Sequence, residues 1–147
     1  MSKISTHNLT NKMINHPLSD LISQTELLEN IADQHGTPTY VYSKKRLEEN
    51  IDKLSRAISS NFINYQIYYA VKANSNIHII KTLKSRFNDL GCDCSSPGEL
   101  FAAKKAGLKM SECVYTGNYE SFEDLQTAYD SGPEINLDDL NLSLIHI

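Results

Sequence analysis

The nine residues YYAVKANSN, Tyr68 to Asn76, end an apolar run with one lysine and follow it with small and amide side chains. The aromatic and β-branched residues predict a strand over 65–72. Side chains alternate along a strand, so Tyr68, Ala70 and Lys72 would share one face. The small side chain of Ala70 would leave room beside the amine for a planar ligand.

The residues themselves leave two interpretations of Lys72 open. A lysine at a strand end commonly extends its amine into water. A desolvated amine instead loses its proton more readily and attacks a carbonyl to form a Schiff base. Asp93, at the end of the next expected strand, is well placed to hold such an amine when it is released.

Strands and helices alternate on both sides of this stretch. We predict strands over 37–43, 65–72, 89–94, 112–116 and 134–138. We predict a short helix before Gly36, and helices over 44–59, 75–87, 97–106 and 122–131. The apolar stripe of the second helix consists of Leu47, Ile51, Leu54 and Ile58.

The expected strands end near Lys72, Asp93, Thr116 and Asp138, at intervals of 21, 23 and 22 residues. Repeated strand–helix units of this length predict right-handed crossovers and a parallel sheet. An open doubly wound sheet and a closed (β/α)₈ barrel are both built this way. Either one gathers functional groups at the carboxyl ends of its strands, where Lys72, Asp93 and the TGN segment would lie.

The helix over 97–106 has clear signals at both ends. Ser96 is expected as the N-cap, Pro97 as the first helical residue and Gly107 as the stop. Glu99 is three residues after Ser96, which predicts a reciprocal capping box. A carboxylate occupied in this way is not free to act as a catalytic base.

Composition excludes several classes of protein. The net charge of −4 argues against a nucleic acid or an anionic membrane as partner, and no apolar run is long enough to span a bilayer. The N-terminus lacks the apolar core of a secretory signal. The three cysteines and five histidines match no common metal-site spacing, so we expect no metal, reduced thiols and a cytoplasmic location.

Three blocks together, YYAVKANSN, GCDCSSPGEL and VYTGN, resemble the N-terminal part of the fold-type III pyridoxal-phosphate decarboxylases. The resemblance covers about 38–139. Diaminopimelate decarboxylases are the most similar branch, and ornithine and arginine decarboxylases are more distant. The resemblance implies a partial (β/α)₈ TIM barrel of the alanine-racemase-like type within the α/β class.

The resemblance also implies roles for individual residues. Lys72 matches the lysine that forms a Schiff base with pyridoxal 5′-phosphate, and Asp93 matches an acid beside that lysine. Ala70 would lie against the cofactor, and Glu99 and Asn74 are further candidates.

The implied reaction is decarboxylation of a small amino acid, meso-diaminopimelate to L-lysine, in lysine biosynthesis. Two alternatives remain at this point. One is a polyamine-pathway decarboxylase acting on ornithine, arginine or carboxynorspermidine. The other is a non-catalytic cofactor-binding homologue.

The expected organisation is an N-terminal polar and helical extension over 1–36, half of a barrel over 37–139 and an abnormal tail over 140–147. A complete barrel needs roughly 250 residues. The family's glycine-rich phosphate loop, its ring-stacking histidine and its C-terminal β domain have no match in the chain. We therefore expect a truncated chain that is inactive alone, from a parent that forms a homodimer.

Overall fold

Residues 19–118 and 120–137 are described by a computed structural model, which divides the chain into two units, Met1–Arg46 and Leu47–Ile147. Each unit is considered by itself. The expected tail over 140–147, and Asp138 at the end of the last expected strand, lie outside the described residues.

The first unit contains two short helices, α2 (Ser19–Ile22) and α3 (Thr25–His35). Helix α3 ends before Gly36 as predicted, and none of its residues is buried. The strand predicted over 37–43 is wrong: among the described residues this segment has no strand partner, and Tyr40 is 90% exposed. A β-prone sequence becomes a strand only where another strand pairs with it.

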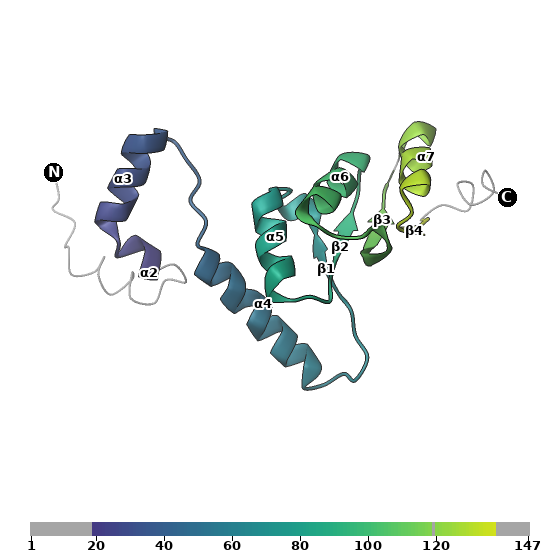
Figure 1. The fold of residues 1–147 in the computed structure, drawn as a ribbon, viewed down its shortest axis with the longest axis horizontal. Coiled ribbons are helices and arrows are strands. Elements are labelled where there is room, and N and C mark those ends of the chain that lie inside the picture. The colour runs from purple at the N-terminus through teal and green to yellow at the C-terminus, as the bar shows by residue number, and fades with distance from the viewer. Residues whose placement is uncertain (1–18, 119, 138–147) are drawn as a thin grey trace, which may run out of the picture. The chain divides into compact units, whose positions relative to one another are not determined.

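The second unit contains a four-stranded sheet whose strands are all parallel, as the strand–helix period predicts, and lie in the order β1-β2-β3-β4 (Figure 1). The strands are β1 (Ile67–Ala70), β2 (Leu90–Cys94), β3 (Cys113–Thr116) and β4 (Glu134–Asn136). Helices α5 (Ile77–Arg86), α6 (Pro97–Ala106) and α7 (Phe122–Ser131) alternate with them, and α4 (Lys44–Ser59) comes before β1. Two short 3₁₀ turns, η1 (Val71–Ala73) and η2 (Met110–Glu112), complete the set.

One face of the sheet is packed against helices. Its side chains and those of the helices form the main core cluster, whose strand members are Cys92, Cys94, Cys113 and Tyr115. These four are at most 1% exposed. Because strand side chains alternate, the residues between them point to the opposite face. Asp93 and Thr116 are on that opposite face.

A second cluster attaches α4 to the sheet. Ile51 of α4 packs with Ile67 of β1 and Leu90 of β2. Arg86 of α5 binds the carboxylate of Asp52 at 2.6 Å. Leu54 belongs to the apolar stripe of α4 but is 47% exposed.

Helix ends agree with the sequence signals. The Oγ atom of Ser96 accepts the Glu99 backbone N–H at 3.3 Å, and Pro97 opens α6. Gly107 closes that helix at a φ of 102°, a left-handed conformation that glycine adopts without a steric penalty. At the start of α7, Ser121 acts as the N-cap as Ser96 does in α6: its Oγ accepts the backbone N–H of Asp124 at 3.1 Å.

The strand predicted over 65–72 is shorter than expected. It ends at Ala70, and Lys72 lies in the 3₁₀ turn η1 instead of at a strand end. The buried side chain of Val71 is part of the main core cluster, with no exposed area. The chain therefore bends toward the core one residue before the lysine.

In the part of the chain that the structure describes, no helix combines the length and apolar character needed to cross a bilayer.

Candidate functional site

A polar cavity of about 350 Å³ lies at the carboxyl ends of β1, β2 and β3. It is lined by Lys72, Asp93, Ser95, Thr116 and Asn118. Three successive strand–helix connections contribute to it, as the carboxyl ends of neighbouring parallel strands meet at one edge of a sheet. The structure thus brings Lys72 and Asp93 together, which the spacing of the sequence predicts.

Lys72 reaches this cavity from the η1 turn. Its side chain is exposed, so the desolvated amine considered from the sequence is not observed in this structure. Ala70 is partly buried and is paired in register with Asp93, but it is not among the cavity-lining residues. The η1 turn, and not a continuation of β1, therefore determines the position of the Lys72 amine.

Asp93 is held by the sheet itself. It is the fourth residue of β2, paired with Ala70 on one side and Val114 on the other. Its side chain is partly buried on the face opposite the helix-packed core. A strand interior fixes a side chain more firmly than a loop does, so this carboxylate is a rigid part of the cavity wall.

Glu99 lies outside the cavity lining and has a structural contact. Its Oε2 accepts the backbone N–H of Ser95 at 2.8 Å and the hydroxyl of Ser95 at 3.2 Å. The predicted reciprocal bond to Ser96 is therefore shifted by one residue. Through this contact Glu99 fixes the turn that presents Ser95 to the cavity.

Asn74 is also outside the lining. Its backbone carbonyl accepts the hydroxyl of Tyr69 at 2.9 Å, and its Oδ1 accepts the backbone N–H of Asn76 at 3.0 Å. Asn76 in turn caps α5 by accepting the backbone N–H of His78 at 2.9 Å. These bonds shape the connection that follows Lys72.

A buried tyrosine of β3, Tyr115, holds the segment that follows Thr116 from the helix-covered face of the sheet. The hydroxyl of Tyr115 donates to Oε1 of Glu120 at 2.5 Å, and burial raises the pKa of Tyr115. The Glu120 carboxylate occupies the space beside Gly117: a Cβ added to this glycine would lie 1.8 Å from the Cδ atom of Glu120. Gly117 therefore gives the carboxylate the space it needs, next to the cavity residue Asn118.

Three thiols lie behind the site, on the helix-covered face. Burial raises the pKa of Cys92 to about 12. Cys94 and Cys113 share a hydrogen bond, which raises the pKa of the Cys94 donor and lowers the pKa of the Cys113 acceptor. Their side chains do not line the cavity, because strand alternation directs them to the other face of the sheet.

Sequence reasoning missed two features, the place of Ser95 in the lining and the bond made by the hydroxyl of Tyr69. Ser95 enters the lining through the turn held by Glu99, and its place directly after the end of β2 is a signal that could have identified it. Thr116 and Asn118 belong to the TGN segment, which the sequence places at the strand ends, and both line the cavity. Tyr69 was assigned to the strand, and nothing local in the sequence indicates that its hydroxyl reaches Asn74.

Comparison with known proteins gives a consistent result. The family model described as "Pyridoxal-dependent decarboxylase, pyridoxal binding domain" matches residues 48–144. A diaminopimelate decarboxylase of Methanothermobacter thermautotrophicus is 40% identical over 118 residues, which are 80% of this chain and 27% of that protein. The chain spans about a quarter of the length of the curated relatives it matches.

Solved structures agree in fold. Diaminopimelate decarboxylase from Helicobacter pylori, an I148L mutant complexed with L-lysine, superposes with a TM-score of 0.70 at 29% identity, over 80% of this chain and 29% of that one. Lysine/ornithine decarboxylase of Vibrio vulnificus, complexed with putrescine, gives a TM-score of 0.65 at 21% identity, over 81% and 31%. The parallel sheet described above is therefore part of a (β/α)₈ barrel, as the resemblance of the three sequence blocks implies.

Proposed function

Because the chain belongs to the family of pyridoxal-dependent decarboxylases, we propose that it supplies the lysine-bearing part of an amino-acid decarboxylase site. The proposed reaction is the conversion of meso-diaminopimelate to L-lysine. It concerns the whole protein that contains these residues, since the chain spans about a quarter of its curated relatives. The observation that carries the proposal is one polar cavity that holds both Lys72 and Asp93.

The residues of the cavity suit pyridoxal phosphate. A primary amine is the group with which the aldehyde of that cofactor reacts, and Lys72 brings one to the cavity. Ser95, Thr116 and Asn118 add hydroxyl and amide groups that hydrogen-bond to a polar ligand. When bound, the cofactor supplies a ring that accepts the electrons left behind as CO₂ departs.

The residues of the chain have distinct tasks in this proposal. Lys72 would hold the cofactor through its amine. Asp93 would hold the side chain of Lys72 within the cavity whenever that amine carries a charge and is not bonded to the cofactor, because opposite charges in a partly buried site attract. Glu99 keeps Ser95 in position through the two bonds described above.

The substrate assignment is supported by the names of the relatives. The curated proteins at 30–40% identity are called diaminopimelate decarboxylases, including those of Methanothermobacter and Aquifex aeolicus. The likeness to the Vibrio lysine/ornithine decarboxylase is at 21% identity and speaks for the fold alone. Relative kcat/KM for meso-diaminopimelate, L-ornithine and L-arginine tests the choice, and preference for ornithine would overturn it.

Two further properties belong to the proposal. The whole protein is a homodimer, as the resemblance implies, which sedimentation at several concentrations tests. Its compartment is the reducing cytoplasm. This location is supported by the odd number of cysteines in the sequence, three, which does not suggest a disulfide framework.

Labelling tests the central assignment. We expect incubation with pyridoxal phosphate, reduction with borohydride and peptide mapping to place the pyridoxyl label on Lys72. Lys72→Arg should abolish that labelled peptide, and Lys81→Arg should leave it unchanged as a matched control. Label distributed evenly among surface lysines would contradict the assignment.

A further inference from the structure

The Lys72 turn is fixed at three points between Tyr69 and Asn76. Before the lysine, Val71 is fully buried in the main core cluster. After it, the carbonyl of Asn74 accepts the Tyr69 hydroxyl at 2.9 Å, and Oδ1 of Asn74 accepts the Asn76 N–H at 3.0 Å. Since Asn76 caps α5, the turn is bonded both to the strand before it and to the helix after it.

Tyr69 provides the link that bridges the turn. It precedes Lys72 by three residues and points to the helix-covered face of the sheet, opposite to Ala70. Its ring packs against both core clusters, and its hydroxyl bond to Asn74 is partly buried. A partly buried bond anchored by a packed ring holds its geometry better than an exposed one.

We propose that the hydroxyl of Tyr69 is a positioning group for Lys72: it holds the Val71–Asn74 turn so that the amine faces the cavity. Tyr69 acts from the other side of the sheet and does not line the cavity, so it does not touch the reacting atoms. The catalytic purpose of this positioning rests on the proposed function, while the hydrogen bond between Tyr69 and Asn74 is a property of the fold.

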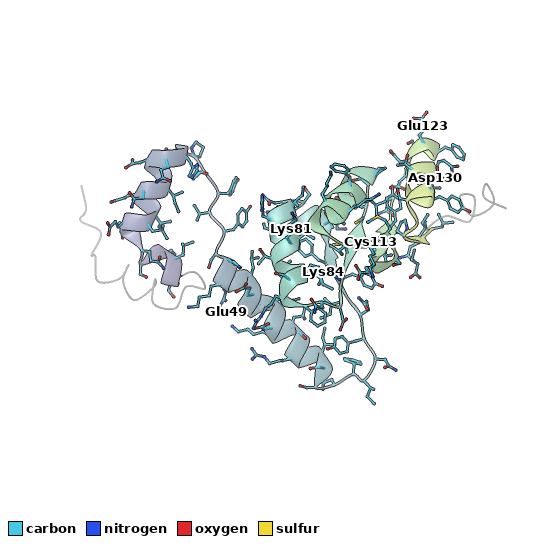
Figure 2. All side chains as sticks on the ribbon, in the orientation of Figure 1. Glu49, Lys81, Lys84, Cys113, Glu123 and Asp130 are labelled. Carbon is cyan, nitrogen blue, oxygen red and sulfur yellow. The ribbon has the colours of Figure 1, made fainter. Side chains whose placement is uncertain are left out.

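Competing amines make the effect measurable. A separate cavity of about 530 Å³ at the N-terminus of α5 is lined in part by Lys81 and Lys105 (Lys81 is labelled in Figure 2). These two lysines lie on helices and not on the Lys72 turn. A loosened turn should therefore change the labelling of Lys72 and spare Lys81 and Lys105.

The test is Tyr69→Phe, which keeps the ring and removes the hydroxyl. With pyridoxal phosphate and borohydride, we expect the rate of labelling at Lys72 to fall about fivefold, the effect of losing one neutral hydrogen bond. Labelling of Lys81 and Lys105 should stay at the wild-type rate. Tyr40→Phe, which removes a hydroxyl from a side chain that is 90% exposed, is the matched control and should change nothing.

A second measurement does not depend on the cofactor. Amide hydrogen exchange over 71–76 should accelerate about fivefold in Tyr69→Phe, while exchange within β2 stays as in the wild type. A ring with a merely structural role would leave exchange in both segments unchanged, and a global loss of stability would raise both. Either result would overturn the inference.

The two measurements separate this inference from the proposed function. In one outcome, exchange over 71–76 is faster in Tyr69→Phe than in the wild type, but the wild type shows no preferential labelling of Lys72. This outcome supports the role of the Tyr69–Asn74 hydrogen bond and refutes the proposed function. Preferential labelling of Lys72 that is equal in the wild type and Tyr69→Phe, with equal exchange, supports the proposed function and overturns the inference.

Discussion

Gly117→Ala should break the contact between Tyr115 and Glu120. The new Cβ would lie 1.8 Å from Cδ and 1.9 Å from Oε1 of Glu120, far inside van der Waals contact. Glu120 must therefore move its carboxylate away. Tyr115 then loses the acceptor of its hydroxyl, and the side chain has no exposed area through which water could replace it.

The size of the effect follows from that hydroxyl. A buried donor left without a partner costs about 1–3 kcal/mol. Replacement of glycine by alanine returns about 0.4–1 kcal/mol by restricting the unfolded chain. We expect Gly117→Ala to lower the free energy of unfolding by about 1–2 kcal/mol as the balance of these two effects.

A double-mutant cycle measures the cause directly. Gly117→Ala, Tyr115→Phe and the double variant are unfolded in urea, and their free energies of unfolding are compared. In the Tyr115→Phe background no hydroxyl is left unpaired, so Gly117→Ala should cost at least about 1 kcal/mol less than in the wild type. Additivity within about 0.5 kcal/mol would refute the explanation.

Three other predictions concern the same unit. Gly91→Ala should destabilise the fold by about 1–3 kcal/mol in urea unfolding, because its Cβ would lie 2.6 Å from the backbone oxygen of Glu112. Gly98→Ala is the control: its Cβ would meet nothing nearer than 3.8 Å, so it should cost less than about 1 kcal/mol. A backbone hydrogen bond from Lys109 lowers the pKa of Glu112 below its ordinary value of 4.5, so its stabilising effect is complete above pH 4.5 and is lost as the pH falls through the lowered value. The difference in melting temperature between the wild type and Glu112→Gln should shrink over that acidic range, and a constant difference would contradict this. Burial raises the pKa of Cys92 to about 12, so native protein at about pH 8 should resist iodoacetamide at this thiol, whereas unfolded protein should not, as mass mapping would show.

Local signals in the sequence were reliable where the structure depends on near neighbours. Ser96, Pro97 and Gly107 define the ends of α6 as predicted, since capping involves atoms within a few residues. The parallel direction of the strands also followed from the sequence, because a strand–helix–strand unit of this length constrains the next strand to be parallel. Their spatial order did not, because the period alone fits both an open doubly wound sheet and a closed barrel.

Features that depend on distant partners were not predictable in the same way. The segment over 37–43 has the composition of a strand, but among the described residues no other strand pairs with it. A local sequence pattern cannot predict whether a pairing strand is present. The strand before Lys72 ends two residues early because the side chain of Val71 enters the core. The candidate site followed the same division: its position at the strand ends was predicted, whereas the turn that carries Lys72 and the Tyr69 bond were not.

Within a strand, alternating side chains separate core residues from cavity residues, so that even and odd residue numbers fall on different faces of the sheet. In β2, even-numbered residues Cys92 and Cys94 belong to the core, and odd-numbered Asp93 belongs to the cavity. Cavity residues can thus be redesigned without repacking the core. Inserting one residue into β2 after Leu90 would exchange the two sets, turning thiols toward the cavity and a carboxylate into the helix layer. Inserting two would restore the facing, so tolerance of insertions here should depend on whether their length is odd or even.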